Sequence, residues 1–124
     1  MKKLLFVFAF FMPIVANAFT GKAEVNGIWY YIVTKGQTAE VVIPNDDKRY
    51  SGDVIIPATI EYEGIICNVT SIGQRAFQSC NGLTSISIPE GVTSIGYQSF
   101  QFCDGLTNVA IPSSITSIGE GAHK

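Results

Sequence analysis

A repeat of 23 residues constrains this chain more than any other feature of its sequence. Residues 72–94 read IGQRAFQSCNGLTSISIPEGVTS, and residues 95–117 read IGYQSFQFCDGLTNVAIPSSITS. The two segments align without a gap and are identical at 12 of 23 positions. A partial copy with an insertion precedes them at 51–71, and another begins at 118–124. Self-similarity at this period predicts supersecondary units that stack and share one apolar core.

Within each repeat, the apolar pattern predicts one short strand with a single buried face. Ile86 and Ile88 are separated by one small polar residue, which is the period of a strand. Pro89 ends this strand because it has no backbone N–H for the ladder. Gly96 permits a tight corner. Residues 76–80 are expected to form a short helical turn that closes the coil.

The partial copy at 51–71 contains nine more residues than the full repeat between its proline and the following valine. Apolar residues flank a Glu63-Gly64 pair in this insertion, and this pattern predicts a β-hairpin grown out of the first coil. Cys67 lies in the insertion and is expected to be the most exposed of the three cysteines.

Cys80 and Cys103 occupy the same position in successive repeats. Stacking would bring their Cα atoms to about 5 Å, the spacing of adjacent strands, which permits a disulfide. Equivalent side chains in a stack point in parallel, however, and small thiols suit an apolar interior. Both states stay open, with free thiols favoured.

Residues 1–18 have the features of a secretory signal peptide. Lys2 and Lys3 precede an apolar stretch that ends in Ala16-Asn17-Ala18, an A-x-A cleavage pattern. The apolar stretch is shorter than the roughly 20 residues that span a bilayer. Export by cleavage after Ala18 is therefore predicted, without a retained membrane span. Cleavage leaves six basic and ten acidic residues, scattered along the chain, which argues against nucleic acid as a partner.

Residues 19–50 are expected to form an N-terminal β-strand cap. The strand-rich runs 27–33 and 39–43 flank a turn at 35–37 and predict a strand pair. Alternation places Tyr30 on the opposite face from Trp29 and Tyr31. An aromatic contact site on the outward face is the alternative to a purely structural cap.

The sequence offers almost nothing for catalysis or cofactor binding. His123 is the only histidine and lies one residue from the end. Asp46 and Asp47 lack the set spacing of oxygen ligands that a calcium loop needs. We expect a protein that is not an enzyme and has no metal or cofactor.

Several short segments resemble the BspA-like leucine-rich repeats, the 23-residue class found in bacterial surface proteins. These segments are LTSISIP, VTSIG, RAF and LTNVAIP. The resemblance covers residues 52–124. It implies a β-rich α/β leucine-rich-repeat solenoid with an N-terminal β-hairpin cap. It also implies a secreted or surface-attached protein, because family members are typically exported and several bind host proteins or other bacterial cells.

Two features depart from the family pattern. His123 stands where the full repeats have Phe77 and Phe100, and the chain stops inside a repeat. A stack ending there exposes an apolar end and an open strand edge. We therefore expect a fold truncated at its C-terminal end, being either a fragment of a longer protein or a chain whose end a partner covers.

Four residues form the candidate binding face, because they alternate with the buried residues of the repeat strands: Ser85, Ser87, Asn108 and Ala110. A secreted or cell-surface module for adhesion or recognition is the preferred function, with a host or bacterial protein or glycan as partner. A truncated, purely structural repeat fragment without a ligand is the alternative. The sequence leaves the ligand and the oligomeric state open.

Overall fold

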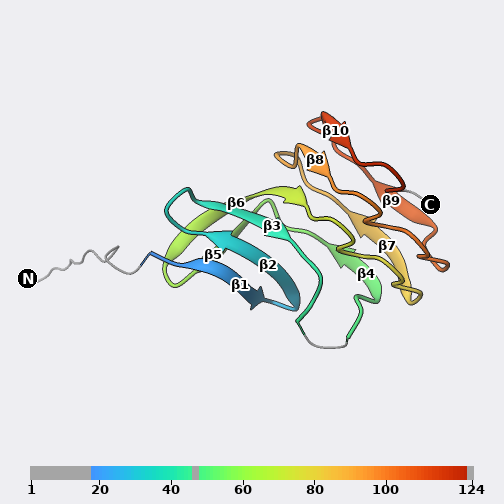
Figure 1. Cartoon of the computed structure of the whole chain (residues 1–124), viewed down its shortest axis with the longest axis horizontal. Helices are drawn as coiled ribbons and strands as arrows, with labels where there is room; N and C mark the ends of the chain where they lie inside the picture. Colours follow the sequence, from blue (N-terminus) through green and yellow to red (C-terminus); the bar gives the residue numbers. More distant parts are fainter. Residues whose placement is uncertain (1–17, 46–47, 123–124) are drawn as a thin grey trace, which may run out of the picture.

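A computed structural model of the chain describes residues 18–45 and 48–122 (Figure 1). Within them lie ten strands and no helix: β1 (Thr20–Val25), β2 (Ile28–Val33), β3 (Thr38–Val41), β4 (Gly52–Ile55), β5 (Thr59–Tyr62), β6 (Ile65–Ile72), β7 (Leu83–Ser87), β8 (Ser94–Ile95), β9 (Asn108–Ala110) and β10 (Ser117–Ile118). Seven form a long sheet in the order β1-β2-β3-β6-β8-β10, with β5 also paired to β6. The other three form a short sheet in the order β4-β7-β9.

Equivalent positions of successive repeats lie beside one another in both sheets. In the short sheet Ile86 pairs with Val109, and in the long sheet Ile95 pairs with Ile118, in each case 23 residues apart. All of these pairings are parallel, since each coil runs in the same direction as its neighbour. The predicted stacking of the repeats is confirmed at these positions.

The segments between the strands stack in the same register. The Phe77 and Phe100 rings are parallel within 10°, with centroids 5.2 Å apart. The Thr93 N–H donates to Thr70 O at 2.9 Å, and the Thr116 N–H donates to Thr93 O at 2.8 Å. Backbone hydrogen bonds therefore run from coil to coil outside the sheets as well as inside them.

The expected helical turn at 76–80 is wrong, and so is the α/β part of the expected fold class, because the described residues form strands and no helix. Residues 74–79 form successive tight turns, in which Arg75 has a φ of 59° and Ser79 a φ of 61°. A residue in the left-handed region interrupts a right-handed helix. Alternate N–H groups then point along the stack, so Phe77 N–H donates to Ser99 O at 2.8 Å in the next coil. A helix would have used these donors internally.

Gly96 lies at the corner where one coil crosses the next. A Cβ atom here would lie 2.6 Å from the Gln74 N atom and 2.8 Å from the Gly73 carbonyl carbon. Gly119 stands in the same relation to Tyr97, at 2.5 Å from its N atom. Neither glycine has a positive φ. Glycine is required here by close backbone approach, and not by an unusual backbone angle.

Residues 20–41 contribute three strands that extend the long sheet beyond β6. β2 and β3 form the expected antiparallel pair, and β1 adds a further antiparallel strand that the sequence did not suggest. β3 then pairs in parallel with β6. Tyr30 is fully buried while Tyr31 is exposed on the other side of β2, so the predicted alternation is confirmed.

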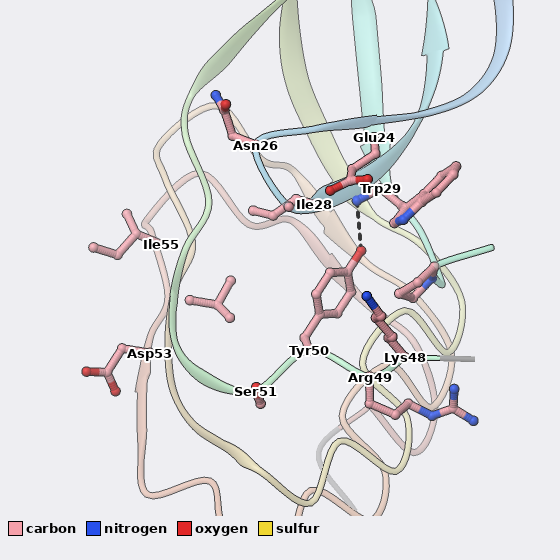
Figure 2. Close-up of a pocket in the computed structure, with 13 residues that line it drawn as sticks. Glu24, Asn26, Ile28, Trp29, Lys48, Arg49, Tyr50, Ser51, Asp53 and Ile55 are labelled. Atoms are coloured by element: carbon pink, nitrogen blue, oxygen red, sulfur yellow. Dashed lines mark hydrogen bonds between the residues drawn. The ribbon is translucent and has the colours of Figure 1, made fainter. Parts of the chain in front are cut away.

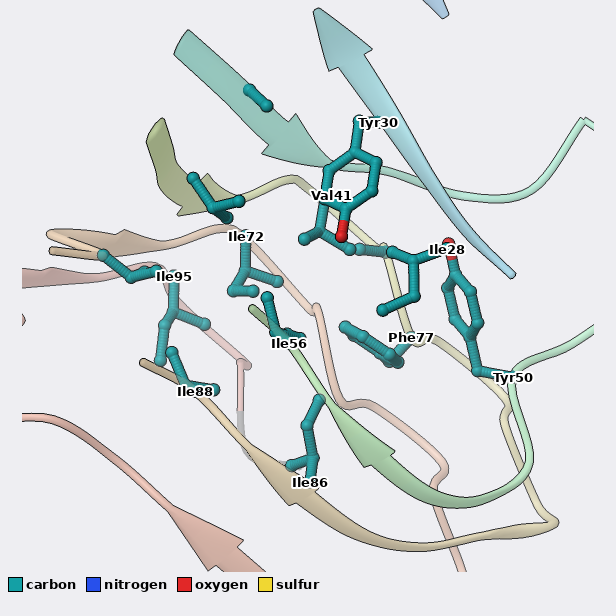
Figure 3. Close-up of a cluster of buried hydrophobic side chains, with 14 of the residues drawn as sticks. Ile28, Tyr30, Val41, Tyr50, Ile56, Ile72, Phe77, Ile86, Ile88 and Ile95 are labelled. Carbon is teal, nitrogen blue, oxygen red and sulfur yellow. The ribbon is translucent and has the colours of Figure 1, made fainter. Parts of the chain in front are cut away.

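The apolar core lies between the two sheets (Figure 3). Tyr30 and Val41 enter it from the long sheet, and Ile56 and Ile86 enter it from the side of the short sheet. Phe77 closes it on the turn side and packs against Tyr50, with ring centroids 4.7 Å apart. One continuous core therefore joins the N-terminal strands to the repeats.

The hairpin β5–β6 turns at Glu63 and Gly64, within the nine extra residues of the first coil. Cys67 points inward from β6 and is completely buried. The expectation that it is the most exposed cysteine is wrong, because alternation along β6 turns it towards the core. All three cysteines are free, and Cys103 is the least buried of them.

Burial decreases sharply towards the C-terminal end of the stack. Ile72 is 1% exposed and Ile95 is 3% exposed, whereas the equivalent Ile118 is 54% exposed. Ile86 and Val109 show the same change, from 2% to 44%. The last described strands thus expose apolar side chains, such as Val109 and Ile118, at the C-terminal end of the stack.

Candidate binding surfaces

The outer face of the short sheet carries two rows of residues in register. Asp53, Ser85 and Asn108 form one row, and Ile55, Ser87 and Ala110 form the other. The four residues selected from sequence, Ser85, Ser87, Asn108 and Ala110, therefore lie together on this face. Their inward neighbour in β7, Ile86, is buried in the core.

Asp53 organises the start of this face. Its Oδ1 atom accepts a hydrogen bond from Ser85 Oγ at 2.8 Å and another from Thr84 Oγ1 at 2.9 Å. These two hydroxyl donors, Ser85 first, lower the pKa of the Asp53 carboxyl group. Asp53 therefore stays charged and places one fixed negative group on an otherwise uncharged surface.

A second feature lies between β4 and the turn that joins β1 to β2. A cavity of about 460 Å³ is bordered by Asn26, Trp29, Arg49, Asp53 and Ile55, among other residues (Figure 2). A cavity of about 370 Å³ continues from it past Asn26 and Ile55 to Pro57 and Glu61. We call the two together the β4 groove, and none of the sequence patterns indicated it.

Tyr50 fixes the wall of this groove. Its hydroxyl group donates to Val42 O at 2.9 Å and accepts a hydrogen bond from the backbone N–H of Trp29 at 2.9 Å (Figure 2). Its ring packs on Phe77 in the core. The N-terminal strands and the first repeat coil are thereby held in one relative position.

A third cavity, of about 580 Å³, opens at the C-terminal end of the stack. Apolar side chains line most of it. Leu106, Val109, Ile111 and Ile118 have buried equivalents in the preceding coil, and Phe102 adds an exposed ring. It is the unpaired end of the stack described above, and its shape follows from stacking alone.

The described part of the chain contains no cluster of side chains suited to bind a metal ion. Among residues 18–45 and 48–122, no three His, Cys, Asp or Glu side chains could together hold a metal ion. Asp46, Asp47 and His123 lie outside the described residues. No helix in the described ranges is long and apolar enough to cross a membrane.

The cysteine thiols are held in their neutral form. Burial and the neighbouring Cys103 thiol raise the pKa of Cys80 to about 11. Burial also raises the pKa of Cys67 and of Cys103, whose thiol donates to Phe77 O at 2.9 Å. Because the thiolate is the reactive form, these cysteines have a structural environment and not that of a nucleophile.

Residues 58–124 match the family model whose description reads "BspA type Leucine rich repeat region (6 copies)". Among solved structures, a leucine-rich repeat protein from Bacteroides capillosus has a TM-score of 0.70 and 30% identity, over 81% of this chain and 72% of that one. A leucine-rich repeat protein from Bacteroides ovatus has a TM-score of 0.67 and 32% identity, over 75% of this chain and 24% of that one.

A leucine rich cell surface protein from Faecalibacterium prausnitzii has a TM-score of 0.64 and 29% identity. The match covers 82% of this chain and 27% of that protein. The chain thus spans most of the first of these three structures and about a quarter of the other two. A comparison with curated protein sequences gives no match.

Proposed function

The chain belongs to the BspA-type leucine-rich-repeat family, and we propose that it is an exported recognition module that binds a protein or glycan at a bacterial or host surface. The contact surface is the outer face of the short sheet, with Ser85, Ser87, Asn108 and Ala110 at its centre. The surface location of the F. prausnitzii relative supports this proposal.

The observation that carries the proposal is the regular outer face of β4, β7 and β9. Parallel strands in register repeat the same side-chain positions at a spacing of about 4.8 Å, which gives a flat surface with fixed hydrogen-bonding groups. Small side chains allow a partner to approach the backbone closely. The charge of Asp53 and the absence of a basic residue from either row do not favour a polyanion.

The proposed organisation follows the sequence pattern. Residues 1–18, almost all outside the described ranges, act as the signal peptide, and residues 19–50 form an N-terminal cap over the first coil. Residues 51–124 form the repeat solenoid, with full coils at 72–94 and 95–117. The cap role is supported by the way β3 continues the long sheet beside β6, which covers the core edge of the first coil. The recognition role is a non-enzymatic one.

A binding experiment with substituted faces tests the function. The fluorescently labelled chain is titrated onto immobilised host-matrix proteins and onto bacterial and epithelial cells. A Ser87→Arg/Ala110→Arg double variant places two long cations on the proposed face and is expected to abolish saturable binding. Ser117→Arg, an exposed serine on a strand of the long sheet, is the matched control and should bind as the parent does.

Equal binding by the parent and the double variant would exclude this face. If the folded parent binds none of these surfaces, the recognition function is wrong, and the alternative of a purely structural repeat segment gains support.

A further inference from the structure

β4 is an edge strand whose second side is open. The Gly52 N–H donates to Gly82 O at 2.8 Å and the Ile56 N–H donates to Ser87 O at 3.0 Å, so these groups face the neighbouring strand β7. Peptide groups alternate in direction along a strand. The N–H and C=O groups of Asp53 and Ile55 therefore face the other way, towards the β4 groove. An edge of this kind is a template for a further strand.

The β4 groove has the dimensions and walls that an added strand requires. Its two cavities, of about 460 and 370 Å³, share Asn26, Ile28 and Ile55 and so form one channel along the strand. The β1–β2 turn, which carries Asn26, forms the opposite wall (Figure 2). Three residues of β4, Asp53, Val54 and Ile55, border it, and a partner segment of about four to six extended residues would cover that stretch and its flanks.

Side chains along the groove differ in character from one end to the other. Arg49 borders the end at which β4 begins, and Glu61 borders the end beyond Pro57. Between them Ile55 is 74% exposed, the most exposed of the large apolar side chains described. Glu24 and Asp53 also border the cavity at the Arg49 end. A bound segment would therefore meet charges of both signs there, then the apolar Ile55, and then the carboxylate of Glu61.

Tyr30 lies at the inner wall of the groove. Its side chain borders the second cavity and is completely buried, yet its hydroxyl group makes no hydrogen bond to any described residue. Burial raises the pKa of this hydroxyl, so it stays protonated. Buried hydroxyl groups normally have a partner, so this hydroxyl, which is directed into the core towards Val41, is an unusual feature beside the groove (Figure 3).

We propose that the β4 groove binds an extended peptide segment of a partner protein, which adds to β4 as a further strand of the short sheet. This inference rests on the recognition function proposed above and names its partner class and a second contact site. Main-chain hydrogen bonds to Asp53 and Ile55 supply affinity. Alternate side chains of the peptide contact Ile55 and the cavity, and a basic residue near Glu61 sets its direction.

A substitution at Ile55 tests the strand addition. Ile55→Pro removes the outward N–H while leaving the Gly52 and Ile56 donors to β7 in place, and proline is tolerated on edge strands in this orientation. Peptides are selected from a displayed library of random dodecamers on the parent chain. We expect them to bind Ile55→Pro about tenfold more weakly, as the loss of one backbone hydrogen bond implies. Ile55→Thr keeps the N–H and removes only part of the apolar contact, so it should weaken binding less than Ile55→Pro does.

N-methylation of each selected peptide gives a second measurement that does not depend on the folding of a variant. Strand addition predicts weakened binding at every second peptide position, since only alternate N–H groups face β4. Equal affinity for the parent and Ile55→Pro, or no period of two in the N-methyl series, would overturn the inference. So would a library that yields no binder at all.

The cell-binding experiment separates this inference from the function on which it rests. If the parent chain binds cells, the Ser87→Arg/Ala110→Arg variant does not, and no peptide is selected, then only the groove proposal fails. If it binds neither cells nor peptides, both fail.

Discussion

Replacing Gly96 with alanine is expected to destabilise the fold although it adds only one methyl group. The new Cβ atom would lie 2.6 Å from Gln74 N, whereas ordinary contacts to a Cβ begin at 3.4 Å. The 0.8 Å difference between these distances must be made up by separating two coils, because the contacting atoms belong to the backbone. That separation also stretches the 2.8 Å hydrogen bond from the Gly96 N–H to Ile72 O.

The size of the effect follows from two opposing terms. Forcing a methyl group into a packed contact costs about 1–3 kcal/mol. Removing a glycine from the unfolded chain returns about 0.4–1 kcal/mol. We therefore expect the free energy of unfolding to fall by roughly 1–2 kcal/mol, which corresponds to a decrease in Tm of about 4–15 °C for a domain of this size.

Urea and thermal denaturation, followed by circular dichroism, measure this change. Gly36→Ala is the matched control, because its Cβ would meet nothing closer than Val33 Cγ1 at 3.9 Å, and it should leave stability unchanged or slightly raised. Gly119→Ala has a shorter contact, 2.5 Å to Tyr97 N, but the last described coil can move outward, so its cost should be smaller. A Gly96→Ala variant as stable as the parent would refute the close-approach argument.

Three further results are expected. Ile86→Ala should lower the free energy of unfolding by about 2–5 kcal/mol in urea denaturation, but Val109→Ala by less than about 1 kcal/mol, because only the first side chain is buried. The pKa of Cys80 is about 11 in the folded chain and 9.0 in the unfolded chain. The contribution of this thiol to the free energy of unfolding should therefore be fully present below pH 9 and be lost between pH 9 and 11. Cys80→Ala should make the resulting fall in stability shallower in denaturation curves across this range. Ser85→Ala should raise the pKa of Asp53 towards its ordinary value, as measured by NMR titration.

The stacking of the repeats was predictable because it depends on identity at fixed spacing. Ile86 and Val109 occupy the same repeat position, so pairing them in register aligns the apolar rows of successive coils. Phe77 and Phe100 stack for the same reason. Periodic burial leaves a regular pattern of apolar residues in the sequence. A shift of the register by one residue would have turned these apolar side chains to solvent.

The turn conformation left no comparable trace. Arg75, Ser79 and their equivalents Gln98 and Phe102 all have positive φ, although none of these residue types favours that region. Coil-to-coil hydrogen bonds select the conformation, and local propensity does not. β1 was missed because TGKAEV has little apolar content, and its pairing partner β2 determines its structure.

The candidate surface was predictable in part. Strand alternation placed Ser85 and Ser87 outward, and their role in binding remains a prediction. The β4 groove could not be inferred, since it depends on where the β1–β2 turn comes to lie against β4, more than 20 residues further along the chain. The hydroxyl of Tyr50, which fixes that distance by its bond to the Trp29 N–H, carries no recognisable motif.

The alternating N–H groups of the turns give the stack a direction. Arg75 N–H donates to Tyr97 O, and one coil later Gln98 N–H donates to Glu120 O, so each turn offers donors on its C-terminal side and carbonyl groups on its N-terminal side. Elsewhere in each coil the direction is reversed, since the Thr93 N–H donates back to Thr70 O and the Gly96 N–H donates back to Ile72 O. A twofold-related pairing of two C-terminal faces would set donors against donors along the turns, whereas a coil added head to tail would satisfy every one of them.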